Sequence, residues 1–405
     1  MKKTYFCNSL QYMGIKPGND YYAKSIMQKA NVVGWKTATA IVVANMVGTG
    51  VFTSLGFQLV ATQNTWSILL LWALGAIMAL CGALSYAELS THLVRSGGEY
   101  HFLSKIYHPY IGYLSGWVSL TVGFAAPVAL AAMALAEYSA IYLSIPPQII
   151  ALVAVLAIAA FHSVSLQKSS QLQNISTLIK IVLILAIIAA GIWITPDQSA
   201  LNWNSNWQQE IVLPAFAVSF VYVTFSYSGW NAAAYIADEI QDVRKNLPKA
   251  LILGTLLVSA LYLLLNYVFL KQAPLSALQG ELKVGQVAAI QMFGTNGGKL
   301  ISLAIGLMLV SSISAMAWAG PRVTQVMAED HRLWRRFAAR NTKSIPVAAI
   351  WLQTGITCLL VLTGTFEQVL IYSGFILQLF AALAVAAVFL LRKKNKAPKG
   401  FRSPL

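Results

Sequence analysis

Residues 37–60 of the chain read TATAIVVANMVGTGVFTSLGFQLV. This run is long enough to cross a bilayer as a helix, because a span needs about 20 mostly apolar residues. Val47, Gly48, Thr49 and Gly50 interrupt it near its middle. Glycine in a membrane helix either allows close helix packing or marks a break. A break exposes backbone N–H and C=O groups that hydrocarbon cannot satisfy, so it must line a polar cavity.

A second interruption of the same kind lies in the sixth apolar run, where Ser226, Tyr227, Ser228 and Gly229 follow one another. Five spans in each half is an odd number, so the second half must start on the opposite side of the membrane. Two breaks in the first span of each half therefore predict inverted repeats. The ten predicted spans are 37–60, 66–90, 107–142, 147–162, 174–195, 209–237, 248–270, 284–318, 345–363 and 367–391.

Composition agrees with a membrane protein. Of the 405 residues, 58% are hydrophobic and only 10% are charged, with a mean hydropathy of +0.65, whereas soluble proteins carry about 25% charged residues. The net charge is +15. If the N-terminus lies inside, 24 of the 28 Lys and Arg lie on the inner side of the membrane. Three lie on the outer side: Lys271, Lys283 and Lys299. This asymmetry predicts a multi-pass protein of the cell inner (plasma) membrane with both termini cytoplasmic.

The predicted fold is an all-α polytopic membrane protein with a five-plus-five inverted-repeat transporter core, broken first and sixth helices, and ten spans. No soluble domain separates from this core. The predicted divisions are a cytoplasmic N-terminal arm at 1–34, the first five-helix repeat at 35–195, the second at 209–391, and a basic cytoplasmic tail at 392–405.

The chemistry of a broken helix suits a zwitterion. Free N–H groups at the start of the outer half-helix carry partial positive charge and favour a carboxylate, while free carbonyls at the end of the inner half-helix favour an ammonium group. An α-amino acid is the simplest solute with both groups. No Asp or Glu falls within either break, which argues against a second cationic group on the substrate.

Three motifs follow one another along the chain. They are VGTGVF at 47–52, LSYAEL at 84–89 with RSGGEY at 95–100, and YSGWN at 227–231 with DEI at 238–240 and RKNLP at 244–248. Together they resemble the motifs of the amino acid–polyamine–organocation transporter superfamily, over residues 35–402, and YSGWN is nearest to the L-type, neutral amino acid branch. The family usually has twelve spans, whereas ten are predicted here, and residues 398–402 resemble the linker before an eleventh.

The breaks and this resemblance together imply the substrate site. We expect the carboxylate near the N–H groups of Thr49 and Gly50, and the ammonium near the carbonyls of Met46, Phe225 and Ser228. The resemblance makes Phe225 the aromatic gate over the substrate; the alternative is one more packed ring. The expected substrate-binding residues are Met46, Gly48, Thr49, Gly50, Phe225, Tyr227, Ser228, Gly229, Trp230 and Asn231.

Lys180 is the only basic residue deep in a predicted span, and such residues are costly unless they have a function. Its position, six residues from the inner end of the span, also allows the side chain to snorkel to the cytoplasm. The resemblance implies a coupling role, with the ammonium standing where related transporters bind sodium, between helices 1 and 8. Ser311 and Ser312 are then the nearby hydroxyls, and transport does not need sodium.

The sequence thus predicts a secondary active permease for neutral α-amino acids, working as a proton symporter or an exchanger. The alternative within transport is a cationic amino acid or polyamine antiporter, and a different class is a truncated, non-transporting remnant or sensor. No enzyme motif is present, and no cofactor, metal site or nucleic-acid partner is predicted. Membrane lipid is an expected partner, and the sequence identifies no partner subunit. Cys7, Cys81 and Cys358 lack metal-site spacing.

Overall fold

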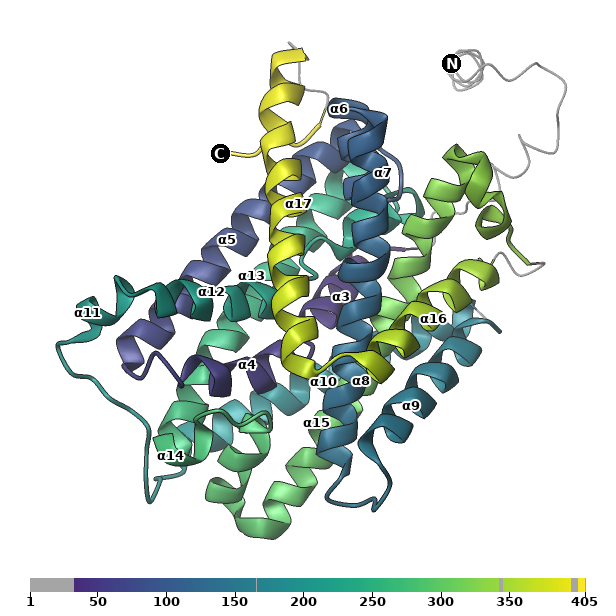
Figure 1. Ribbon diagram of the computed structural model, residues 1–405. Helices are drawn as coiled ribbons and strands as arrows, with labels where there is room; N and C mark the ends of the chain where they lie inside the picture. The colour runs from purple at the N-terminus through teal and green to yellow at the C-terminus, as the bar shows by residue number, and fades with distance from the viewer. Residues whose placement is uncertain (1–32, 165, 342–344, 395–399, 405) are drawn as a thin grey trace, which may run out of the picture.

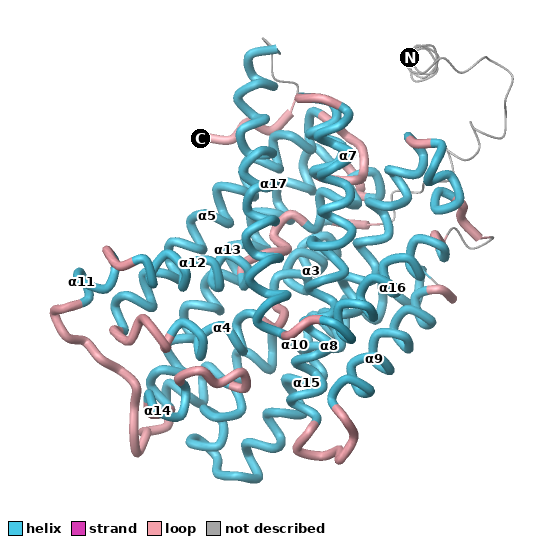
Figure 2. Tube along the Cα trace, in the orientation of Figure 1, coloured by secondary structure: helices cyan, strands magenta, loops and turns pink. Residues whose placement is uncertain are grey.

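A computed structural model describes residues 33–164, 166–341, 345–394 and 400–404. Most of the predicted N-terminal arm and part of the basic tail lie outside the described residues. Within them all regular structure is helical, apart from one bridge between Val33 and Ile240 (Figure 2). The helices are α3 (Trp35–Met46), α4 (Gly50–Gln58), α5 (Thr65–His92), α6 (Glu99–Ile106), α7 (Pro109–Val118), η1 (Ser119–Ala125), α8 (Ala126–Ser139), α9 (Pro147–His162), α10 (Leu166–Trp193), α11 (Trp207–Ile211), α12 (Pro214–Ser226), η2 (Ala232–Glu239), α13 (Val243–Gln272), α14 (Leu275–Leu278), α15 (Val284–Asp330), η3 (Arg332–Ala338), α16 (Val347–Thr363) and α17 (Phe366–Lys394).

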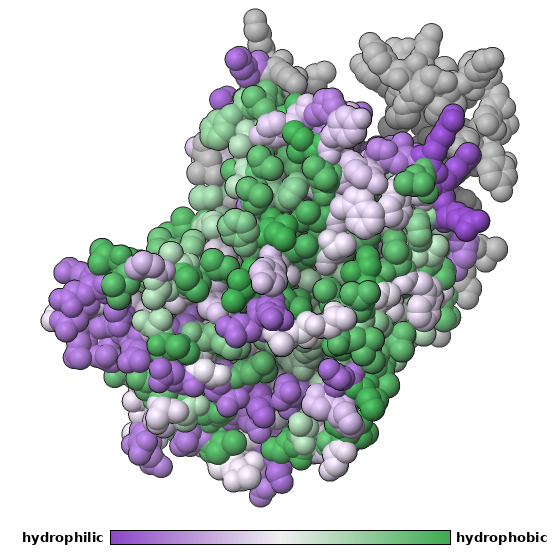
Figure 3. Space-filling model, viewed as in Figure 1, coloured by the Kyte–Doolittle hydropathy of each residue, from purple (hydrophilic) through white to green (hydrophobic). Residues whose placement is uncertain are grey.

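The apolar helices make this a polytopic membrane protein. In the part of the chain that the structure describes, seven helical segments are long and apolar enough to cross a membrane. Three of the predicted spans coincide with shorter apolar helices, α9, α12 and α16, so the number of ten crossings stays a prediction. Hydrophobic side chains cover much of the face in Figure 3, and α9, α16 and α17 all carry exposed large apolar residues, as lipid-facing helices require.

Local sequence explains several helix ends. The side chain of Asn64 caps α5 by accepting a hydrogen bond from the N–H of Trp66 at 2.9 Å, the usual role of an N-cap asparagine. Proline occupies the first position of α7, α9 and α12, where its missing N–H has no helical partner to lose. A kink at Gly294 divides α15, which continues to Asp330, beyond the end expected for that span.

Both expected breaks are present, near the centre of the bundle (Figure 1). The first apolar run ends its helix α3 at Met46 and resumes as α4 at Gly50. The sixth apolar run, which contains the second break, ends its helix α12 at Ser226 and resumes as η2 at Ala232. In the segment Trp35–Gln58, which contains the first break, 89% of the most apolar stretch of 18 residues is buried, a larger share than in any other candidate span. Breaks of this kind are tolerated inside a bundle because the surrounding protein can satisfy the freed backbone groups.

Candidate functional site

The two breaks lie against each other. Gly229 has a φ of +97°, and a Cβ on it would lie 2.7 Å from the carbonyl oxygen of Asn45. A Cβ on Gly50 would lie 2.5 Å from the Cα of Ser226. A side chain at either glycine would therefore collide with the backbone of the opposite break. In this conformation Ser226 fills the space beside Gly50.

A cavity of about 40 Å³ opens beside the breaks, which is room for about three waters. An amino acid therefore needs these walls to move apart. Four of the ten expected substrate residues, Ser228, Gly229, Trp230 and Asn231, line the cavity. Part of the wall is η1, a π-helical stretch whose Gly123 and Phe124 face the cavity; such stretches often occur at functional sites. The other six expected residues, Met46, Gly48, Thr49, Gly50, Phe225 and Tyr227, lie outside this lining.

The backbone of the first break offers donors but fewer acceptors than expected. Among the described residues, no hydrogen bond engages the N–H of Thr49 or Gly50. The carbonyl of Met46 accepts from the N–H of Gly48 at 2.8 Å and from the hydroxyl of Tyr262 at 2.6 Å. A carbonyl has two lone pairs, so in this conformation the carbonyl of Met46 is not open to an ammonium group.

Two aromatic residues of the expected site are packed. Phe225 is 4% exposed and belongs to an apolar cluster with Tyr222 and Leu370. Tyr227 is fully buried, and its hydroxyl donates to the carbonyl of Trp72 at 3.0 Å. Both rings hold neighbouring helices together in this conformation and do not face the cavity. Their packing follows from tertiary contacts that no local pattern indicated.

Lys180 is fully buried and does not snorkel. Its ammonium donates to the carbonyl of Val47 at 2.7 Å, to the hydroxyl of Ser312 at 2.9 Å and to the carbonyl of Ala44 at 3.3 Å. One cation on α10 thereby joins the first break to α15, in the place that the resemblance implied. Its coupling role stays a prediction.

The two adjacent serines of α15 differ. Ser312 donates to the carbonyl of Val47 at 2.7 Å as well as accepting from Lys180. Ser311 instead donates to the hydroxyl of Ser176 at 3.0 Å, because consecutive helix residues point in different directions. Of the two serines expected beside the lysine, the structure thus joins only Ser312 to it.

Comparison with known proteins agrees with this geometry. The sequence profile of the family described as amino acid permease matches residues 33–405, which is nearly all of the chain. The chain belongs to the amino acid permease family. It is therefore a membrane transporter and not an enzyme.

Individual relatives of this permease are transporters too. It is 28% identical over 382 residues to the serine/threonine exchanger SteT of Bacillus subtilis (strain 168), covering 91% of this chain and 84% of the relative. It is 27% identical over 377 residues to the human b(0,+)-type amino acid transporter 1, covering 90% and 76%. It is also 25% identical over 391 residues to the mouse large neutral amino acids transporter small subunit 2, covering 92% and 72%.

The permease cavity also contains residues that the sequence did not single out. Asn45 and Met316 come from α3 and α15, and Tyr235 comes from η2. Glu99 is the most consequential, because it lines the cavity although it belongs to the segment between the second and third spans. Glu99 stands in the RSGGEY motif at 95–100, which was quoted for the family resemblance without a role at the site. No acid falls within either break, but Glu99 reaches the cavity from another segment.

Proposed function

We propose that this permease is a secondary transporter of neutral α-amino acids that works by alternating access, as a proton symporter or an exchanger. The observation that carries the proposal is the meeting of two broken helices at one cavity, where no described residue bonds the N–H groups of Thr49 and Gly50. Relatives described as a serine/threonine exchanger and a large neutral amino acids transporter subunit support the substrate class.

We propose that the substrate carboxylate binds the N–H groups of Thr49 and Gly50, at the N-terminal end of α4. Its ammonium group binds the carbonyl of Ser228 on the cavity wall. The carbonyl of Met46 becomes available only if the bond from Tyr262 opens. The cavity must widen for this, and movement of α4 and η2 around the breaks provides the space.

Coupling is proposed to use Lys180 in place of a sodium ion. Its ammonium ties the carbonyl of Val47 to α15 through Ser312, as a bound metal ion would. Transport then proceeds without sodium. The basic loops and the tail face the cytoplasm of a cell inner membrane, and residues 35–195 and 209–391 form the two inverted repeats.

A cationic amino acid or polyamine is the second candidate substrate, because Glu99 lines the cavity. A carboxylate there can pair with a second cationic group.

Exchange in proteoliposomes tests the proposal. The full chain is reconstituted, loaded with unlabelled serine, and given labelled serine outside with an excess of each competitor. We expect small and apolar neutral amino acids to compete, while arginine, lysine and putrescine do not. If the cations compete best, the second candidate replaces the first. If no amino acid exchanges and none is taken up with an inward proton gradient, the transport proposal is wrong.

A further inference from the structure

Glu99 is the charged residue of the cavity wall. Its side chain is 2% exposed. The preceding Gly97 and Gly98 have φ values of +109° and +51°, in the left-handed region that favours glycine. A Cβ on Gly98 would also lie 2.6 Å from the ring of Tyr235. This glycine turn directs Glu99 from a loop into the interior of the bundle.

The two oxygens of the Glu99 carboxyl have different surroundings. Oε1 accepts from the hydroxyl of Tyr86 at 2.6 Å and from the side-chain amide of Asn231 at 3.0 Å. Oε2 is buried and has no hydrogen-bond partner among the described residues. Asn231 belongs to the second break, so the carboxyl is bonded directly to the expected substrate site. The unpartnered Oε2 is the open position for a proton.

No described cation compensates the charge of Glu99 within ion-pair distance. The titratable groups that face it are the hydroxyls of Tyr86 on α5 and Tyr235 on η2, and the cavity walls from η1, α15 and α17 contribute uncharged side chains. Burial without a cation disfavours the carboxylate. It raises the pKa of Glu99 to about 7, against the opposing hydrogen bonds from Tyr86 and Asn231.

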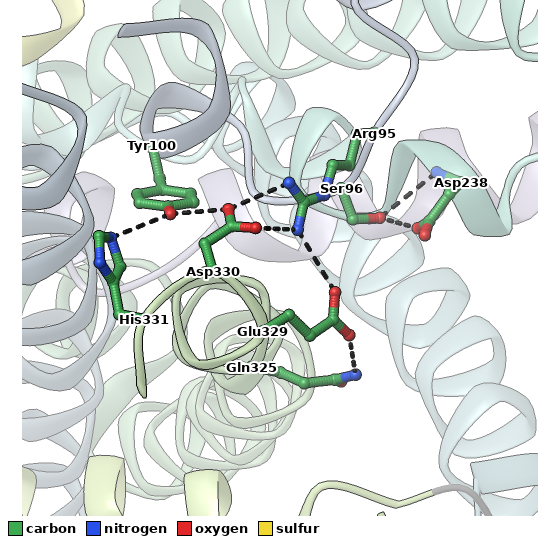
Figure 4. A network of polar contacts seen from close by, with 8 residues as sticks. All are labelled: Arg95, Ser96, Tyr100, Asp238, Gln325, Glu329, Asp330 and His331. Atoms are coloured by element: carbon green, nitrogen blue, oxygen red, sulfur yellow. Dashed lines mark hydrogen bonds and ion pairs between the residues drawn. The ribbon is translucent and has the colours of Figure 1, made fainter. Parts of the chain in front are cut away.

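The segment that carries Glu99 also carries a network of polar contacts on its other side (Figure 4). Arg95 pairs with Asp330 at 3.0 Å and with Glu329 at 3.4 Å, both at the end of α15. The hydroxyl of Tyr100 donates to Asp330 at 2.8 Å. Ser96 is hydrogen-bonded to Asp238 of η2. Residues 95–100 are thus held between α15 and the second break.

We propose that Glu99 is a proton carrier of the transport cycle, taking up a proton when residues 95–100 close the cavity and releasing it to the cytoplasm when they open. This inference rests on the proposed function for its transport cycle. On opening, water reaches Oε2, the O–H bond of the acid breaks, and the proton passes to that water, leaving the carboxylate. Hydration then returns the carboxyl to the usual pKa of a glutamate, about 4.3.

The contacts explain why opening and proton release belong together. Arg95 and Tyr100 lie on either side of Glu99 in the sequence, and both are held by Asp330. When the contacts of Asp330 break, the segment loses its attachment to α15. Glu99 then leaves the dry position in which Tyr86 and Asn231 hold it. The neutral acid is favoured in the closed state and the carboxylate in the open state, which is a population shift linked to pH.

Infrared titration of the purified full chain in detergent tests this inference without requiring transport. Between about pH 5 and about pH 9 we expect the C=O band of a protonated carboxyl to disappear in the parent, with a midpoint near pH 7. Glu99→Gln should lack this transition. Asp330→Asn should move the midpoint to lower pH, because it loosens the closed segment. Glu137→Gln, at the outer end of α8, is the matched control and should titrate like the parent.

The inference is overturned if the band near pH 7 persists in Glu99→Gln, if the parent has no such band, or if Asp330→Asn leaves the midpoint unchanged. Removal of the band by added arginine, but not by serine, also overturns it, because Glu99 then binds a cationic substrate. If Glu99→Gln does not fold, Glu99→Asp serves instead, since it keeps a titrating carboxyl but must change the midpoint or the band position.

Transport measurements separate this inference from the proposed function. If the parent exchanges amino acids and Glu99→Gln retains the same pH profile, the proton carrier is wrong and the transport function stands. If the carboxyl titrates as expected but no amino acid is transported, either by exchange or with a proton gradient, the transport function is wrong. The titration near pH 7 then describes a buried acid with no role in transport, which overturns the carrier as well.

Discussion

Replacing Lys180 by methionine tests the proposed coupling role most directly. Methionine keeps an unbranched apolar side chain of similar length but removes the ammonium. Two short charge-assisted bonds are lost, to Val47 at 2.7 Å and to Ser312 at 2.9 Å. At about 1.5 kcal/mol for each bond to a charged group, the loss is about 3 kcal/mol. If the bonds hold the first break in one state of the cycle, this is about a hundredfold in the transport rate.

The assay is uptake of labelled amino acid into proteoliposomes, with sodium in all solutions replaced by choline. We expect the parent to transport at the same rate in choline, and Lys180→Met to lose about two orders of magnitude in rate. Substrate affinity in detergent should change less, because Lys180 is not in the cavity lining. Ser312→Ala should share part of the defect. Ser311→Ala is the matched control, since its hydroxyl bonds Ser176 instead.

Two results would refute this reasoning. One is a parent that needs sodium, because the ammonium then does not replace the ion. The other is a folded Lys180→Met that transports at the parental rate, because the buried bonds then contribute only to packing. Equal defects in Ser311→Ala and Ser312→Ala would show that disturbance of α15, rather than loss of the lysine contact, slows transport.

The remaining predictions concern packing and pH. Gly50→Val should abolish substrate binding, because the valine side chain collides with Ser226. Binding isotherms measure this, and the control Gly355→Val, at a position with open space around it, should bind substrate normally. Phe225→Ala should lower the melting temperature more than Phe375→Ala, which removes a lipid-facing ring, since truncating a buried phenylalanine costs about 3–5 kcal/mol. Equal melting temperatures in the two variants would contradict the buried packing of Phe225. Because the pKa of Glu99 is raised in the fold to about 7, its stabilising contribution is full below about pH 4.3 and is lost as the pH rises through about 7. Thermal unfolding across this range should show the loss in the parent and not in Glu99→Gln.

The sequence alone determined the class of the molecule and the position of its breaks. Apolar runs of spanning length, few charges and a strong basic asymmetry are properties of composition and order, and they do not depend on how the helices pack. The helix breaks at Gly48 and Gly229 were predictable for a similar reason, because glycine and hydroxyl residues weaken a helix locally. Family resemblance then indicated a position for Lys180, and its contacts with Val47 and Ser312 are found there.

Only the tertiary structure decided which residues form the cavity. Ser311 and Ser312 are neighbours in sequence, but their directions on α15 give them different partners. Phe225 lies just before the second break and Tyr227 lies within it, yet both are packed away from the cavity. Glu99 lies far from both breaks in sequence and reaches Asn231 through a turn of two glycines. Contacts between residues distant along the chain depend on how helices pack, and the periodicity of a single helix contains no information about its neighbours.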